Sequence, residues 1–149
     1  MTSAPDPAPA APGAEAAEAA EDRPLWHLAE EVHWQEALRA GSYERSTRGA
    51  SLAEVGFIHA SWPEQLPGVA KLLYARAAEP LVVLEIDPRA LAQAGVEVRE
   101  EPGDPDDPAS PLFPHLYGPL PVAAVTRTRP AAVQKGWLDL GPWQDVAAC

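Results

Sequence analysis

The chain has 149 residues, a formal net charge of −11 and one cysteine, Cys149 at its last position. Its length suits one ordinary domain, and a single cysteine excludes an intrachain disulfide and a thiolate metal cluster. The acidic charge argues against DNA, which is bound mainly through Lys and Arg contacts to phosphate, and no apolar run approaches the ~20 residues that span a bilayer, so we expect a cytoplasmic protein.

The N-terminal stretch MTSAPDPAPAAPGAEAAEAAED has no aromatic or branched aliphatic residue and no base. Such a composition buries too little apolar surface to offset the entropy cost of ordering. It also lacks the basic start and apolar stretch of a secretory signal. We therefore expect a disordered acidic tail at residues 1–23, a single folded domain at 24–130 and a C-terminal extension at 131–149.

The folded part begins with alternating short strands and helices. PLWHL (24–28) predicts a strand, and EEVHWQEALRAG (30–41) predicts a helix whose apolar residues share one face. Gly41 suits the left-handed position that follows a helix. Three further segments follow, namely a strand at SYERS (42–46), a loop with one helical turn at TRGASLAEV (47–55) and a strand at GFIHA (56–60).

The clearest local signal is SWPE (61–64). It fits a capping box in which Ser61 is the N-cap and Glu64 reaches back, and helical spacing then continues to about Tyr74. Capping alone explains Ser61. The same helix end would also suit an anion, because orphan N–H groups and the helix dipole favour negative charge, and the sequence leaves both interpretations open.

The second half predicts further short elements. LVVLEID (81–87) is typical of a strand buried on both faces, because its apolar run is continuous. The remaining segments are a short helix at PRALAQAG (88–95), a strand at VEVRE (96–100), an acidic Pro-rich loop, an extended FPHLYGPLP (113–121), a last strand at VAAVTRTR (122–129) and a tail at 135–149 that packs its two tryptophans. The pattern indicates an α+β domain without internal repeats.

Three of the strand-like segments each carry one histidine. Strand side chains alternate between faces, so His59 shares a face with Ser61, and His115 shares one with Tyr117. The third histidine, His27, lies in the first predicted strand. A single strand histidine is most often a core or edge residue, but three similar placements favour a shared cleft.

Other site chemistries fit less well. Three histidines can hold a catalytic zinc, but such ligands usually include a short-spaced pair, and here His33 falls on a helix, so we expect no metal. No Gly-x-Ser-x-Gly elbow surrounds Ser61, which argues against a Ser-His-acid triad. The glycine-rich loops that cradle phosphates in the common nucleotide folds are absent.

Five motifs in order resemble a known family. They are LWHLAEEVHWQEALRAGSY (25–43), GFIHAS (56–61), LEID (84–87), REE (99–101) and FPHLYGPLPVAAV (113–125). Together they closely resemble the bacterial and plant family called domain of unknown function 952, over roughly residues 25–129. That family looks related to the ADP-ribosyl transferase superfamily, which includes the tRNA 2′-phosphotransferases and splits NAD between ribose and nicotinamide.

The resemblance implies a fold and a set of site residues. The fold would be a small, split, strongly bent mixed sheet with short helices, similar to the ADP-ribosyl transferase core. In such a site His27 would bond the nicotinamide ribose, while His59 and Ser61 would line the NAD cleft. The implied catalytic residues are His27, His59, Glu100 and His115, and the implied NAD-contacting residues are His27, His59, Ser61, Arg45, Arg48 and Tyr117.

The chain also departs from the superfamily pattern. A transferase of this type has a catalytic Glu near its last strand, and VAAVTRTR (122–129) contains no acid. The Arg-His-His-Arg set of the phosphotransferases is not reproduced cleanly either, although Arg45 and Arg48 supply cations. Two hypotheses follow: an enzyme acting on NAD or a related nucleotide by ADP-ribosyl or phosphoryl transfer, or a non-catalytic module that binds a nucleotide or small ligand in the same cleft. A third reading makes the histidines purely structural.

Overall fold

The computed structural model describes residues 23–46, 51–74, 79–104, 106–135 and 137–146. The predicted tail at 1–23 lies outside the described residues except for Arg23, and so does Arg48. No helix in the described ranges has both the length and the apolar character needed to cross a lipid bilayer.

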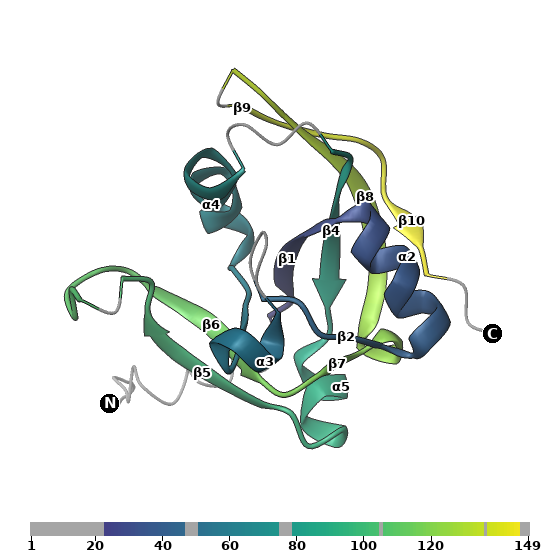
Figure 1. Cartoon of the computed structure of the whole chain (residues 1–149), viewed down its shortest axis with the longest axis horizontal. Helices are drawn as coiled ribbons and strands as arrows, with labels where there is room; N and C mark the ends of the chain where they lie inside the picture. Colours follow the sequence, from purple (N-terminus) through teal and green to yellow (C-terminus); the bar gives the residue numbers. More distant parts are fainter. Residues whose placement is uncertain (1–22, 47–50, 75–78, 105, 136, 147–149) are drawn as a thin grey trace, which may run out of the picture.

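The α+β class is confirmed, and the main sheet lies on one side of the molecule (Figure 1). This sheet contains β1 (Leu25–Glu30), β4 (Leu81–Ile86), β8 (Val125–Gln134), β9 (Trp137–Leu140) and β10 (Gln144–Asp145). Its order is β1-β4-β8, and both β9 and β10 pair with β8. The predicted boundary at residue 130 therefore falls inside β8, and the predicted C-terminal extension contributes strands to the main sheet.

The other strands form two small sheets. One has the order β3-β6-β5, with β3 at Ile58–His59, β6 at Leu112–Tyr117 and β5 at Glu97–Pro102. The other pairs β2 (Ser42–Tyr43) with β7 (Leu120–Pro121). Every pairing between the described strands is antiparallel. The prediction of a mixed sheet is wrong, because an apolar pattern specifies which face of a strand is buried and not the direction of its neighbour.

Short helices cover these sheets. They are α2 (Glu31–Ala40), α3 (Leu52–Val55), α4 (Leu66–Leu73) and α5 (Pro88–Gln93), with 3-10 turns η1 (Pro63–Gln65) and η2 (Val122–Ala124). Helix α2 buries Trp34 and Ala37, and it ends as predicted at Gly41, whose φ of 93° is left-handed and whose N–H donates to the Ala37 carbonyl. The sequence pattern thus predicted both the buried face and the end of this helix.

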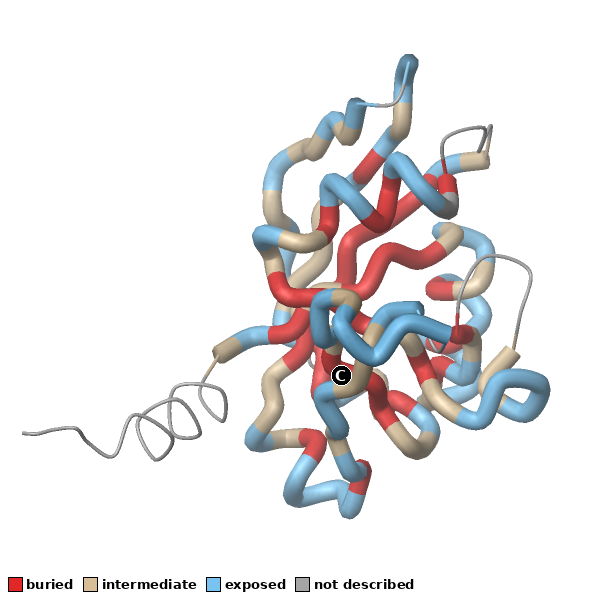
Figure 2. Tube along the Cα trace, turned by 90° about the vertical axis from the view of Figure 1, so that its left-hand side faces the viewer, coloured by how far each residue is buried: buried red, intermediate tan, exposed pale blue. Residues whose placement is uncertain are grey.

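Two buried hydrophobic clusters make up the core, and Figure 2 shows the buried segments running through the centre of the molecule. Strand β4 is central to this core, since Val83, Leu84 and Ile86 are completely buried. In the sheet of β3, β6 and β5, which we call the small sheet, Ile58 and Leu116 are also completely buried. They belong to the same cluster as Leu84. The cluster that contains Leu84 therefore joins the main sheet to the sheet of β3, β6 and β5.

The C-terminal strands are held by a ring contact on the main sheet. Trp143 meets Trp26 edge-on at 5.5 Å between ring centroids, and the guanidinium of Arg127 lies 4.0 Å from the centre of the Trp143 ring. Trp137 instead stays 74% exposed. The prediction that both tail tryptophans pack is thus right for Trp143 and wrong for Trp137, which lies at the end of the β8–β9 hairpin.

A polar junction connects β1 to the strand that carries His59. Trp26 and Ser61 exchange backbone hydrogen bonds of 2.8 and 2.7 Å. His27 Nδ1 donates to the His59 carbonyl at 2.8 Å, and His27 Nε2 then accepts from the Tyr43 hydroxyl at 3.1 Å. His27 is only 2% exposed, and burial lowers its pKa to about 4. The imidazole is therefore a neutral structural group that holds the two sheets together.

We predict that His27→Ala lowers the free energy of unfolding by about 2–5 kcal/mol, because it leaves a cavity and two buried groups without partners. His33→Ala is the matched control. Its imidazole lies on α2, partly exposed, 3.4 Å from Glu30, so its loss should change stability by no more than about 0.5 kcal/mol. Urea denaturation measures both, and equal effects would contradict the structural role of His27.

Candidate functional site

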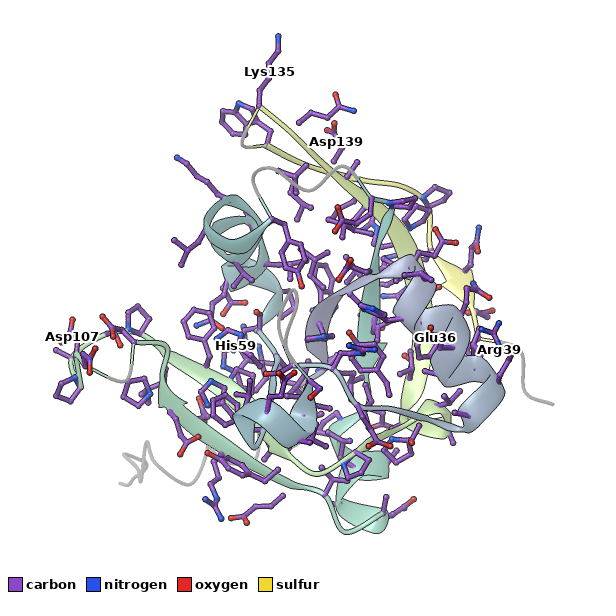
Figure 3. All side chains as sticks on the ribbon, in the orientation of Figure 1. Glu36, Arg39, His59, Asp107, Lys135 and Asp139 are labelled. Atoms are coloured by element: carbon purple, nitrogen blue, oxygen red, sulfur yellow. The ribbon has the colours of Figure 1, made fainter. Side chains whose placement is uncertain are left out.

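Two of the predicted site histidines meet across the small sheet. Strands β3 and β6 pair so that His59 lies opposite His115, with 5.0 Å between the ring centroids. The N–H of Ala60 donates to the Pro114 carbonyl, so the neighbouring histidine pair occupies a position without ladder hydrogen bonds. Side chains approach most closely at such positions. Figure 3 labels His59 on the side of the molecule to which β5 and β6 extend.

Strand alternation places this pair opposite the core. Ile58 and Leu116 point into the core and are completely buried, so His59 and His115 project from the other face of the sheet. We call this surface the histidine face; it consists of Phe57, His59, Glu97, Arg99, Glu101, Phe113, His115 and Tyr117.

Aromatic rings cover the imidazoles on the histidine face. Phe57 stacks on His115 with 4.1 Å between ring centroids and an interplanar angle of 16°. Phe113 lies 4.9 Å from the ring of His59. Both phenylalanines are only partly buried, whereas His115 is 3% exposed. They therefore form an outer layer over the histidine pair.

A carboxylate fixes the orientation of His115. Glu101 Oε1 accepts hydrogen bonds from His115 Nδ1 at 2.9 Å and from the Tyr117 hydroxyl at 2.5 Å. The bond from Tyr117, followed by the bond from His115, lowers the pKa of Glu101. The guanidinium of Arg99 lies 4.2 Å from the centre of the Tyr117 ring. Glu101 thus remains ionised and holds the imidazole by one nitrogen.

The two imidazoles each present a nitrogen without a partner. His59 Nδ1 and His115 Nε2 are buried and have no hydrogen-bond partner in the part of the chain that the structure describes. His115 donates the proton on Nδ1 to Glu101, so the neutral form of this ring carries its lone pair on Nε2. Burial, followed by the charge of His115, lowers the pKa of His59 to about 4. Near neutral pH, the His59 imidazole is therefore uncharged.

His27 does not join this pair as a ligand group. The resemblance implied that it bonds a ribose, but both of its ring nitrogens already bond protein atoms, the His59 carbonyl and the Tyr43 hydroxyl. His27 and His59 lie near one another because His27 donates a hydrogen bond to the His59 carbonyl. Alternation could not distinguish a histidine that faces a ligand from one that faces a neighbouring strand.

The predicted capping box at Ser61 is wrong. Ser61 is 1% exposed and bridges to β1, while Trp62 is the N-cap of η1 and donates its N–H to Gln65 Oε1 at 2.9 Å. Glu64 instead forms an ion pair with Arg23, and the hydrogen bond from that guanidinium lowers its pKa. A carboxylate therefore already lies in the first turn of η1, where the prediction had an anion bind.

The remaining predicted residues lie elsewhere or outside the described ranges. Glu100 pairs with Pro114 and is exposed on the face of β5 opposite the histidine face. Arg45 forms an isolated bridge with Ser51, and Arg48 lies outside the described residues. The acid beside His115 is Glu101, which sequence reasoning missed. Extending the predicted strand by two residues would have revealed it, because Arg99 and Glu101 then share a face.

The comparisons place this geometry in a family. The family model "Protein of unknown function (DUF952)" matches residues 28–128. The crystal structure of protein CC0527 from Caulobacter crescentus is similar, with 26% sequence identity, a TM-score of 0.63 and coverage of 78% of this chain and 93% of that chain. A double mutant of CC0527 gives the same values. No protein with a curated description matches. Since the family model spans more than half of the sequence, the chain belongs to the DUF952 family.

Proposed function

We propose that the chain is an enzyme that acts on NAD or a related nucleotide by ADP-ribosyl or phosphoryl transfer, and that the histidine face is its binding site. The observation that carries the proposal is the pair of buried, unpartnered nitrogens, His59 Nδ1 and His115 Nε2. Buried polar atoms are nearly always hydrogen-bonded in native proteins. A bound ligand would supply the partner that both nitrogens lack.

The neighbouring residues suit acid–base chemistry. A nucleophile or base oriented by a third group is the arrangement common to many transferases, and Glu101 orients His115 in this way. Neutral imidazole both donates and accepts hydrogen bonds, which lets it move a proton to or from a ligand hydroxyl. The rings of Phe57 and Phe113 offer flat surfaces on which a nucleobase can stack.

The similarity to the ADP-ribosyl transferase core belongs to this proposal. It is supported by the motif resemblance and by an acid, Glu101, that lies beside a histidine in a sheet face. In this assignment His59 and His115 replace His27 as the ligand-contacting imidazoles, and Tyr117 holds Glu101 in place. The ligand is a small nucleotide and not DNA, because the acidic charge of the chain disfavours a polyanionic partner.

One observation favours a second candidate, a non-catalytic module that binds the same ligand. Strand β8, with the sequence VTRTRPAAVQ, contains no acidic residue. A ribosyl transferase of the type resembled would use an acid near this strand to stabilise its transition state. If no other group replaces that acid, the site binds a nucleotide without turning it over.

The proposal predicts that NAD or ADP-ribose raises the melting temperature of the protein, because a ligand that binds only the folded state stabilises it by mass action. It further predicts nicotinamide release from NAD or phosphoryl release from a phosphorylated nucleotide. His59→Ala and His115→Ala should each reduce turnover by about 10²–10⁴-fold, which is the usual contribution of a general acid or base.

His33→Ala serves as the control for these variants, since His33 lies on α2 away from the small sheet. Melting temperatures of all variants without ligand identify any loss that arises from unfolding. A nucleotide-induced shift without turnover would identify the binding module. The absence of any shift with NAD, ADP-ribose and phosphorylated sugars would overturn the proposed function.

A further inference from the structure

We infer that the histidine face recognises an uncharged sugar hydroxyl, held between His59 and His115, and not a phosphate group. The inference deepens the proposed function and rests on its assignment of the ligand to the histidine face. It concerns which part of the nucleotide the two imidazoles contact. Three features of the face support it: the polarity of His115, the pairing with His59 and the local balance of charge.

The first feature is the hydrogen-bond polarity of His115. A carboxylate only accepts, so the 2.9 Å contact with Glu101 Oε1 requires the proton on His115 Nδ1. In the neutral ring that donates from Nδ1, the buried Nε2 is a hydrogen-bond acceptor. An acceptor attracts a hydroxyl proton and repels the oxygen of a phosphate. Glu101 therefore acts as a positioning residue that sets what His115 can bind.

The second feature is the unpartnered nitrogen of His59, whose ring lies beside the ring of His115. His59 Nδ1 is also unpartnered, and the rings are 5.0 Å apart between centroids. A single hydroxyl satisfies both nitrogens when it donates to His115 Nε2 and accepts from His59 Nδ1–H. A phosphate oxygen only accepts hydrogen bonds, so it would need a proton on both of these nitrogens.

The third feature is the charge of the histidine face. Its charged members are two carboxylates, Glu97 and Glu101, and one guanidinium, Arg99. Arg99 is already paired with Glu97 at 3.0 Å and lies over the Tyr117 ring. The face is therefore negative and has no guanidinium to spare for a diphosphate. The partly exposed rings of Phe57 and Phe113 suit the apolar side of a sugar or base.

Isothermal titration calorimetry with hydroxyl-bearing probes, their counterparts without ribose hydroxyls and a phosphate probe tests the inference on the full chain at pH 7.5. The hydroxyl-bearing probes are adenosine and nicotinamide riboside, and the phosphate probe is pyrophosphate. We expect at least one nucleoside to bind, the same nucleoside without its ribose hydroxyls to bind at least about tenfold more weakly, and pyrophosphate neither to bind nor to compete. Binding of pyrophosphate that disappears in His59→Ala, or no binding of either nucleoside, would overturn it.

Two neighbouring acids give a matched pair of variants. In Glu101→Gln the carboxamide can donate to His115 Nδ1 and so move the ring proton to Nε2, which should weaken nucleoside binding about tenfold. Glu100→Gln makes the same charge change on the opposite face of β5 and should leave the affinity unchanged. Equal affinities of the two variants would exclude a positioning role for Glu101.

The outcomes separate this inference from the proposed function. If a nucleoside binds through its hydroxyls but NAD neither binds nor reacts, the proposed function fails and the hydroxyl site stands. If NAD binds and pyrophosphate displaces it, the nucleotide site stands and recognition of a hydroxyl fails. Melting temperatures of Glu101→Gln and Glu100→Gln without ligand show whether either variant loses affinity through unfolding.

Discussion

The junction between β1 and β3 fixes the position of His59 in the candidate site. Two backbone hydrogen bonds link Trp26 with Ser61, and the buried imidazole of His27 bonds the carbonyl of His59. With its backbone fixed on one side by β1, His59 turns its side chain to the other side, towards His115. The hydrogen bond from His27 is thus structural. It positions His59, whose Nδ1 has no partner among the described residues.

The second constraint is the carboxylate on β5. Glu101 accepts bonds from both His115 and Tyr117, so one residue orders two side chains of β6. This arrangement fixes the position of the unpartnered Nε2 of His115, which is an acceptor in the neutral ring. The histidine face then combines neutral polar atoms with aromatic rings and a negative local charge. These properties favour recognition of an uncharged hydroxyl and disfavour direct binding of a phosphate by the imidazoles.

The sequence predicted the positions of helices and strands better than it predicted which strands pair. Local chemistry sufficed for the end of α2 at Gly41 and for the buried strand β4, since both depend on nearby residues. Alternation correctly separated His59 from the core residue Ile58. It could not show that His59 pairs with His115, because that register depends on contacts between distant segments.

The errors at the site have the same origin. The predicted strand ended two residues before β5 does and so led to Glu100 in place of Glu101. Neighbouring residues of a strand point to opposite faces. His27 has the sequence context of a site residue, but a tertiary hydrogen bond to the His59 carbonyl makes it structural. Ser61 fits a helix cap by type, yet backbone pairing with β1 buries it and transfers the N-cap position to Trp62.

The central claim is that Glu101 holds His115 by the proton on its Nδ1 and leaves its Nε2 to a ligand. Long-range ¹H–¹⁵N NMR correlation of the histidine rings at pH 7 measures this tautomer directly. The account predicts that the neutral form of His115 carries its proton on Nδ1, and that His59 has a neutral ring at the same pH. A neutral His115 with its proton on Nε2, or a doubly protonated ring at His59, would contradict it.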